Sequence, residues 1–149
     1  MYRKAIQKLG IILNHVLQLS IIIGLIYIQS LTQSRAFVIE YIYQISLDFE
    51  TYFLSSFGII VQSVFIIVLT ASAIYYLFRL IKDQEVLLKK IETGLLIAIN
   101  IFGLLVMHLE FFKNLLNYRY LIIGFYLVFI IQSMNIKLLN NPKRKNEKK

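Results

Sequence analysis

The chain has 149 residues, 58% of them hydrophobic, and a formal net charge of +8. It contains no cysteine, which excludes disulfides, a thiolate nucleophile and cysteine-ligated metal centres. So short and apolar a chain leaves little material for a soluble domain, and this composition predicts a single membrane domain.

Four segments contain no Asp, Glu, Lys or Arg. They are residues 9–31, 52–78, 93–109 and 120–136, with 23, 27, 17 and 17 residues. A helix needs about 20 residues to cross a hydrocarbon core of about 30 Å. We therefore predict an all-α integral membrane four-helix bundle over residues 1–141, with spans at about 9–31, 52–78, 91–109 and 119–136. Residues 142–149 are expected to form a basic cytoplasmic tail.

The basic residues are divided unevenly between the links that join these spans. Of the 16 Lys and Arg, 13 lie in the N-terminal segment, the link between the second and third spans, or the C-terminal end. Because Lys and Arg accumulate on the cytoplasmic side, both termini are expected in the cytoplasm. They flank apolar spans and form no soluble basic face, so no nucleic-acid partner is predicted, although the C-terminal tail could attract anionic lipid.

The first outer segment has two competing patterns. From Phe37 to Phe49 every odd position is apolar, which taken literally is the period of a strand. The same segment places Glu40, Gln44 and Asp48 on one helical stripe, and a lone strand in lipid would leave its backbone unpaired. We favour an interfacial amphipathic helix that continues into the second span through Tyr52.

This acidic and aromatic segment is also the candidate docking surface for a partner. The side chains proposed for docking are Glu40, Tyr41, Tyr43, Asp48 and Glu50. The alternative is that the segment is only a structural collar.

The two remaining links are short. The segment from Arg79 to Lys90 contains no Gly or Pro, so helical structure is expected to continue beyond the membrane around a short turn. The link from Glu110 to Arg119 is also tight. Spans two and three, and spans three and four, are therefore predicted to be neighbouring antiparallel pairs.

The uncharged spans contain amides and histidines that counting along the helices places at similar depths. Gln18, Gln62 and Asn100 fall near mid-bilayer, whereas Asn14 and His15 share a more cytoplasmic level with Gln132. Two interpretations stay open for this candidate polar cluster. The amides join helices by hydrogen bonds, or they line a path for a small solute. Gly24, with Ser20, is the glycine expected to permit close helix contact.

Neither cofactor nor catalytic chemistry is predicted. His15 and His108 lie too far apart in depth to ligate one haem iron, and no carboxylate is expected beside either histidine within the membrane. The chain has no GxSxG or HExxH motif and no paired membrane aspartates. We predict no metal and no enzyme activity.

In size, charge and hydrophobicity the chain resembles immunity proteins that protect producers of pore-forming bacteriocins. No motif supports that resemblance, so no family is assigned. The 26 Ile against one Pro are typical of an AT-rich genome and favour a bacterial source.

The leading hypothesis is a non-catalytic protein of the bacterial cytoplasmic membrane that binds a membrane-protein partner or a second copy of itself. It would serve as an immunity or regulatory factor, or as an accessory subunit. The alternative is a small-solute transporter or channel with an amide-lined path.

Overall fold

The computed structural model describes residues 2–34, 53–84, 86–115 and 118–140, and these ranges are almost entirely helical, with no strand. Four of the helices are long and apolar enough to cross a membrane, as predicted, and they suit a multi-pass membrane protein. The predicted interfacial helix and the basic tail lie outside the described residues, so both stay predictions. The helices are α1 (Tyr2–Ser34), α3 (Ser56–Lys82), α4 (Leu87–His108), α5 (Glu110–Lys113) and α6 (Tyr118–Leu139).

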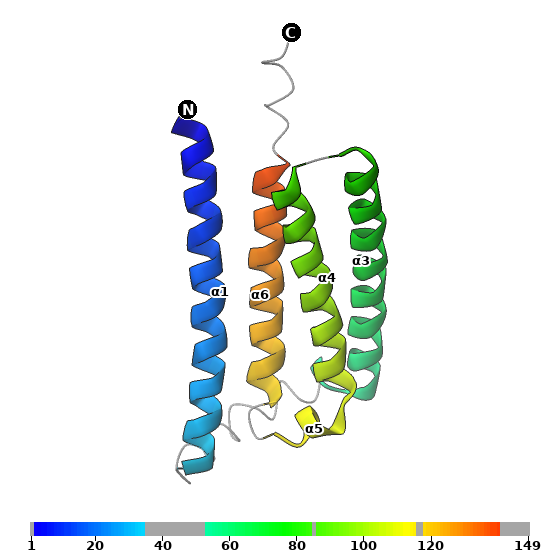
Figure 1. Ribbon diagram of the computed structural model, residues 1–149. Helices are drawn as coiled ribbons and strands as arrows, with labels where there is room; N and C mark the ends of the chain where they lie inside the picture. Colours follow the sequence, from blue (N-terminus) through cyan, green and yellow to red (C-terminus); the bar gives the residue numbers. More distant parts are fainter. Residues whose placement is uncertain (1, 35–52, 85, 116–117, 141–149) are drawn as a thin grey trace.

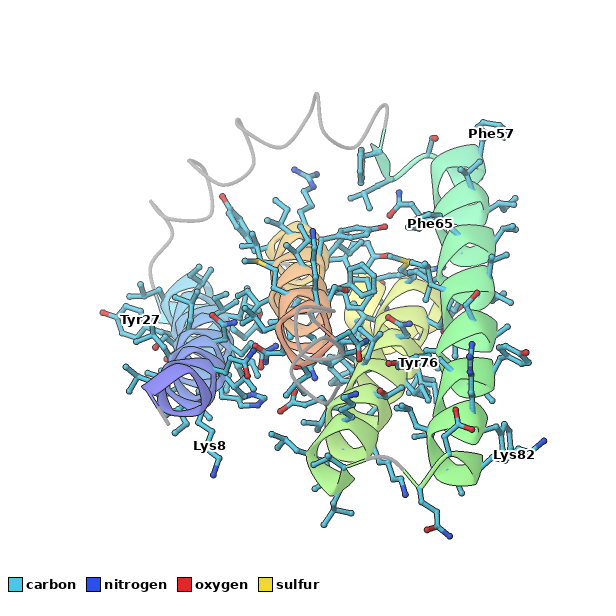
Figure 2. All side chains as sticks on the ribbon, turned by 90° about the horizontal axis from the view of Figure 1, so that it is seen from above. Lys8, Tyr27, Phe57, Phe65, Tyr76 and Lys82 are labelled. Carbon is cyan, nitrogen blue, oxygen red and sulfur yellow. The ribbon has the colours of Figure 1, made fainter. Side chains whose placement is uncertain are left out.

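The four long helices follow one another across the molecule in the order α1, α6, α4, α3 (Figures 1 and 2). The predicted antiparallel pairs, α3 with α4 and α4 with α6, are confirmed. α1 packs mainly on α6 and lies at one edge of the row, opposite α3. Seen from above, Lys8 lies on one edge helix and Lys82 on the other (Figure 2).

α3 does not continue the preceding segment, contrary to the expectation of an unbroken helix through Tyr52. Ser55 has extended backbone angles (φ −57°, ψ 153°), and its side chain accepts a hydrogen bond from the backbone N–H of Gly58. A serine in this position satisfies one of the donors that the first turn leaves unpaired. Ser55 therefore starts a new helix, and the span begins at Ser56 rather than at residue 52.

The link between α3 and α4 is the short turn that was predicted. α3 runs to Lys82, and Gln84 has a positive φ of 49° as the chain turns back. α4 then begins at Leu87, before the predicted start at residue 91, and the helix includes Lys89 and Lys90. Glu92 thus lies more than one turn inside α4 and within the candidate span.

At the opposite end of the molecule, the chain passes from α4 to α6 through the single turn of α5. Leu109 has an extended backbone, with ψ of 128°, and ends α4. The tight link predicted between residues 110 and 119 agrees with this arrangement.

The apolar core lies among α3, α4 and α6, and two glycines let α6 approach its neighbours closely. Gly103 of α4 faces the ring of Phe125, and Gly124 of α6 faces the side chain of Leu25 on α1. A Cβ at either glycine would overlap its neighbour, whereas a Cβ at Gly24 would meet nothing within 4 Å. The close helix contacts are therefore at glycines that the sequence interpretation did not select. The buried core residues are Ile66, Val106, Met107, Ile122 and Phe125.

Candidate functional site

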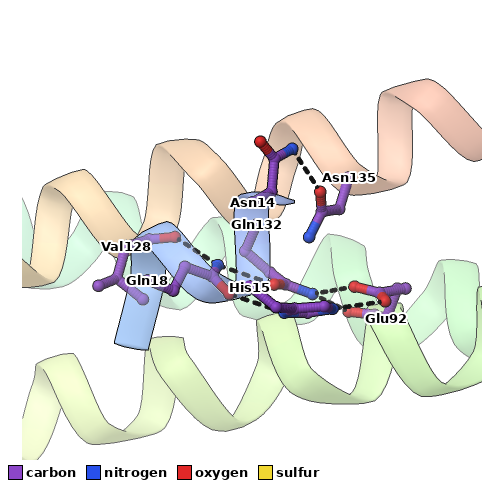
Figure 3. Close-up of polar contacts among 7 residues, drawn as sticks. All are labelled: Asn14, His15, Gln18, Glu92, Val128, Gln132 and Asn135. Atoms are coloured by element: carbon purple, nitrogen blue, oxygen red, sulfur yellow. Dashed lines mark hydrogen bonds and ion pairs between the residues drawn. The ribbon is translucent and has the colours of Figure 1, made fainter. Parts of the chain in front are cut away.

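Four polar side chains from three helices form a closed ring of hydrogen bonds, drawn in Figure 3. We call His15 and Gln18 of α1, Glu92 of α4 and Gln132 of α6 the polar ring. His15 and Gln18 are three residues apart, so they share one face of α1. Glu92 and Gln132 are 2% and 0% exposed, while the side chain of His15 is 37% exposed.

The contacts of the ring are short. His15 Nε2 lies 2.9 Å from Glu92 Oε1, and His15 Nδ1 lies 2.9 Å from Gln18 Oε1. Gln18 Nε2 donates to Gln132 Oε1 at 3.0 Å, and Gln132 Nε2 donates to Glu92 Oε2 at 2.8 Å. The carboxylate of Glu92 thus receives a partner on each oxygen.

Two backbone carbonyls fix the orientation of both amides. Gln18 Nε2 also donates to the carbonyl of Val128 at 3.2 Å, and Gln132 Nε2 also donates to the carbonyl of Glu92 at 2.9 Å. A carbonyl oxygen only accepts, so each amide must turn its NH₂ group toward it. The amide oxygen of Gln18 therefore faces His15.

This orientation determines where the protons of His15 lie. Because Gln18 Oε1 can only accept, His15 Nδ1 must carry a proton. One further proton is then needed between His15 Nε2 and Glu92 Oε1 for a hydrogen bond at 2.9 Å. It resides on the imidazole, giving an ion pair, or on the carboxyl, giving a neutral pair. In both cases the pair has no net charge.

Further polar contacts hold α1 against α6. Asn14 Nδ2 donates to Asn135 Oδ1 at 2.7 Å, and Gln7 Nε2 donates to the carbonyl of Leu138 at 3.4 Å. Together with the ring, these contacts lie along the N-terminal half of α1. These side chains thus connect α1 to α6 by hydrogen bonds.

Of the candidate polar cluster, the structure brings together Asn14, His15, Gln18 and Gln132 but not Gln62 or Asn100. Gln62 donates to the carbonyl of Phe53 at 2.7 Å and accepts from the hydroxyl of Tyr126 at 2.8 Å. Asn100 is fully buried, and neither polar atom of its side chain has a hydrogen-bond partner. Depth alone did not separate these residues from the ring.

The expectation that no carboxylate accompanies a histidine within the membrane was wrong for His15. The polar cluster was chosen from the uncharged runs, so Glu92, one residue before the third run, was not included in it although the predicted span 91–109 contains this residue. Two signals in the sequence could have indicated Glu92. It lies close in depth to His15, and Gln132, which contacts it, was already in the predicted polar cluster. His108, by contrast, contacts the hydroxyl of Ser63 at 2.8 Å, far from the ring along α4.

Within the described residues, no group of three or more His, Asp or Glu could hold a metal ion. The candidate docking residues Glu40, Tyr41, Tyr43, Asp48 and Glu50 lie outside the described residues. Comparisons with protein-family models, with curated proteins and with solved structures find no match to this chain.

Proposed function

We propose that this chain is a non-catalytic protein of the bacterial cytoplasmic membrane that acts by binding a membrane-protein partner. The observation that carries the proposal is that the polar atoms of the ring are hydrogen-bonded to other groups of the protein. In the polar ring, both donors of each glutamine and both oxygens of Glu92 are engaged with other protein groups. Groups engaged in this way join helices and are not free to coordinate a passing solute.

A small hollow in the bundle does not alter this conclusion. It lies among α3, α4 and α6 and encloses about 130 Å³, including space open to solvent. No residue of the polar ring lines it. Its lining residues are Tyr76, Lys89, Thr93, Ile136, Leu139 and Asn140.

The proposed orientation has both termini in the cytoplasm. The N-terminus of α1, the link between α3 and α4 and the C-terminus of α6 lie at one end of the molecule (Figure 1). That end therefore collects Lys8, Lys82, Lys89 and Lys137. A cytoplasmic location for this end agrees with the tendency of Lys and Arg to stay on that side.

Two variants with opposite expected results test the binding function. In a pull-down of the tagged protein from its native membranes in mild detergent, a stoichiometric partner should be recovered with the parent chain. The triple change of Glu40, Asp48 and Glu50 to Lys should abolish that recovery, because it reverses the charge of the predicted docking segment. The double variant Gln62→Leu with Asn100→Leu should retain the partner.

Recovery of the parent chain alone would contradict the binding proposal. Loss of the partner in the Gln62→Leu and Asn100→Leu variant, with retention in the triple Lys variant, would equally contradict the assigned surface. Circular dichroism of each purified variant, showing the helical content of the parent, is the control for folding.

Transport of a small solute is the second candidate, and the His15–Glu92 contact is the observation that favours it. Carboxylate and imidazole groups inside a membrane are the usual carriers of protons in coupled transporters. In this case Glu92→Gln should abolish pH-driven solute uptake into liposomes that contain the purified protein. Gln62→Leu, which leaves the ring intact, is the matched control. Equal uptake by Glu92→Gln and the parent would exclude a proton-coupled mechanism through this site.

A further inference from the structure

We propose that the proton shared by His15 and Glu92 controls the docking of α1 on the rest of the molecule. This goes beyond the proposed function, because it concerns a conformational change of the chain itself. α1 lies at the edge of the row and packs mainly on α6. The His15–Glu92 contact, at 2.9 Å, links α1 to α4.

Removal of the shared proton makes this contact repulsive. The lone pair of His15 Nε2 then faces the ionised carboxylate of Glu92. Moving the remaining imidazole proton from Nδ1 to Nε2 does not help, because Nδ1 would then present a lone pair to Gln18 Oε1. Gln18 cannot turn its amide over without losing its bonds to Val128 and Gln132.

Addition of a second proton weakens the ring. With His15 doubly protonated and Glu92 neutral, the lone pairs of the carboxyl can still accept from His15 Nε2–H and from the NH₂ group of Gln132, but the attraction between opposite charges is lost. The docked arrangement of α1 is therefore most stable with one shared proton, and its loss is expected at alkaline pH.

Other charged groups lie toward the helix ends on every neighbouring element. On its own helix Glu92 follows Lys89 and Lys90, which are half-buried. The packed helices contribute exposed side chains at the same end, namely Lys8 on α1, Arg79 and Lys82 on α3, and Lys137 on α6. These cations do not supply the hydrogen that the contact between His15 and Glu92 needs.

Pulsed electron paramagnetic resonance on spin labels in liposomes tests the proposal. The chain has no cysteine, so Lys8→Cys and Lys137→Cys place one label on α1 and one on α6 at exposed positions. The hydrogen bond from Gln7 to Leu138 shows that the two helices approach each other there. A second pair, Lys82→Cys with Lys137→Cys, reports on α3 and α6, which the ring does not join.

The labelled protein would be measured from about pH 4 to about pH 10, a range that brackets the ordinary titration of His and Glu. The short-distance population of the α1–α6 pair should fall at the alkaline end, while the α3–α6 pair stays constant. In the Glu92→Gln background the α1–α6 pair should keep its short distance there. The glutamine NH₂ donates to neutral His15 Nε2 and its oxygen still accepts from Gln132, so no proton can be lost.

A pH-independent α1–α6 distance in the parent would overturn the proposal. An alkaline change of the same size in the parent and in Glu92→Gln would also overturn it. Glu92→Leu, where it folds, should show the long distance at every pH, and a retained short distance in that variant would be a third contradiction. None of these measurements requires a binding partner or a solute, so their outcome is separate from that of the proposed function.

Discussion

Replacing Glu92 by leucine is expected to lower the free energy of unfolding by about 2–4 kcal/mol. Loss of one member of a buried, hydrogen-bonded charged pair costs about 3–5 kcal/mol in soluble proteins. Hydrogen bonds between membrane helices contribute only about 0.6 kcal/mol on average, so the expected loss of stability in this bundle is smaller than in a soluble protein. The variant leaves His15 Nε2 and one donor of Gln132 without a partner, so the cost exceeds that of a single lost bond.

Glutamine at position 92 should cost less than about 1 kcal/mol, because an amide of the same shape makes both contacts with neutral His15. Reversible unfolding in mixed micelles, followed by circular dichroism, measures both variants. Glu110→Leu is the control, since Glu110 is exposed on α5, and it should change stability by less than about 0.5 kcal/mol. Equal stability of Glu92→Leu and Glu92→Gln would mean that the ring does not stabilise the bundle.

The sequence predicted the four long apolar helices of the described ranges and the antiparallel neighbours among them, because these depend on run length and link length. A run of uncharged residues long enough to cross a membrane must satisfy its backbone internally, which leaves the helix as the available structure. Short links then oblige consecutive helices to lie side by side. The position of α1 beside α6 follows from no such rule, because residues 35–52 separate it from the next described helix.

Within the site, counting residues predicted depth but not direction. Asn14, His15 and Gln132 were placed at one level, and they lie close together in the structure. Gln62 shares a depth with Gln18 but contacts Phe53 and Tyr126, because depth does not specify which way a helix face is turned. Depth gives one coordinate of a side chain, and the rotation of each helix comes only from packing.

Glu92 was missed for a different reason. A search for polar side chains confined to the uncharged runs excludes any ionisable residue beside the end of a run, including one that is paired. The helix begins at Leu87, so Glu92 lies inside it, and burial is tolerated because each carboxylate oxygen has a donor or a shared proton. A search for carboxylates within one or two turns of an apolar run would have found it.

Replacing Gly103 by alanine is expected to destabilise the bundle by about 1–3 kcal/mol, the usual cost of adding atoms to a packed interior. The new Cβ would overlap the ring of Phe125, which is 6% exposed and belongs to the core among α3, α4 and α6. The stiff aromatic ring cannot yield without moving α6. At Gly124 the obstructing group is the end of the Leu25 side chain, which can change rotamer, so Gly124→Ala should cost less.

Gly94→Ala is the matched control, because Gly94 belongs to the same helix and a Cβ there would meet nothing within 4 Å. Both substitutions gain the same helix propensity. The difference between their changes in the free energy of unfolding therefore measures the overlap of the new Cβ with the Phe125 ring. Adding Phe125→Leu to Gly103→Ala should recover part of the loss, giving a coupling of about 0.5–3 kcal/mol in a double-mutant cycle of micelle unfolding. Additive effects of the two substitutions would show that the helices do not meet through this glycine and this ring.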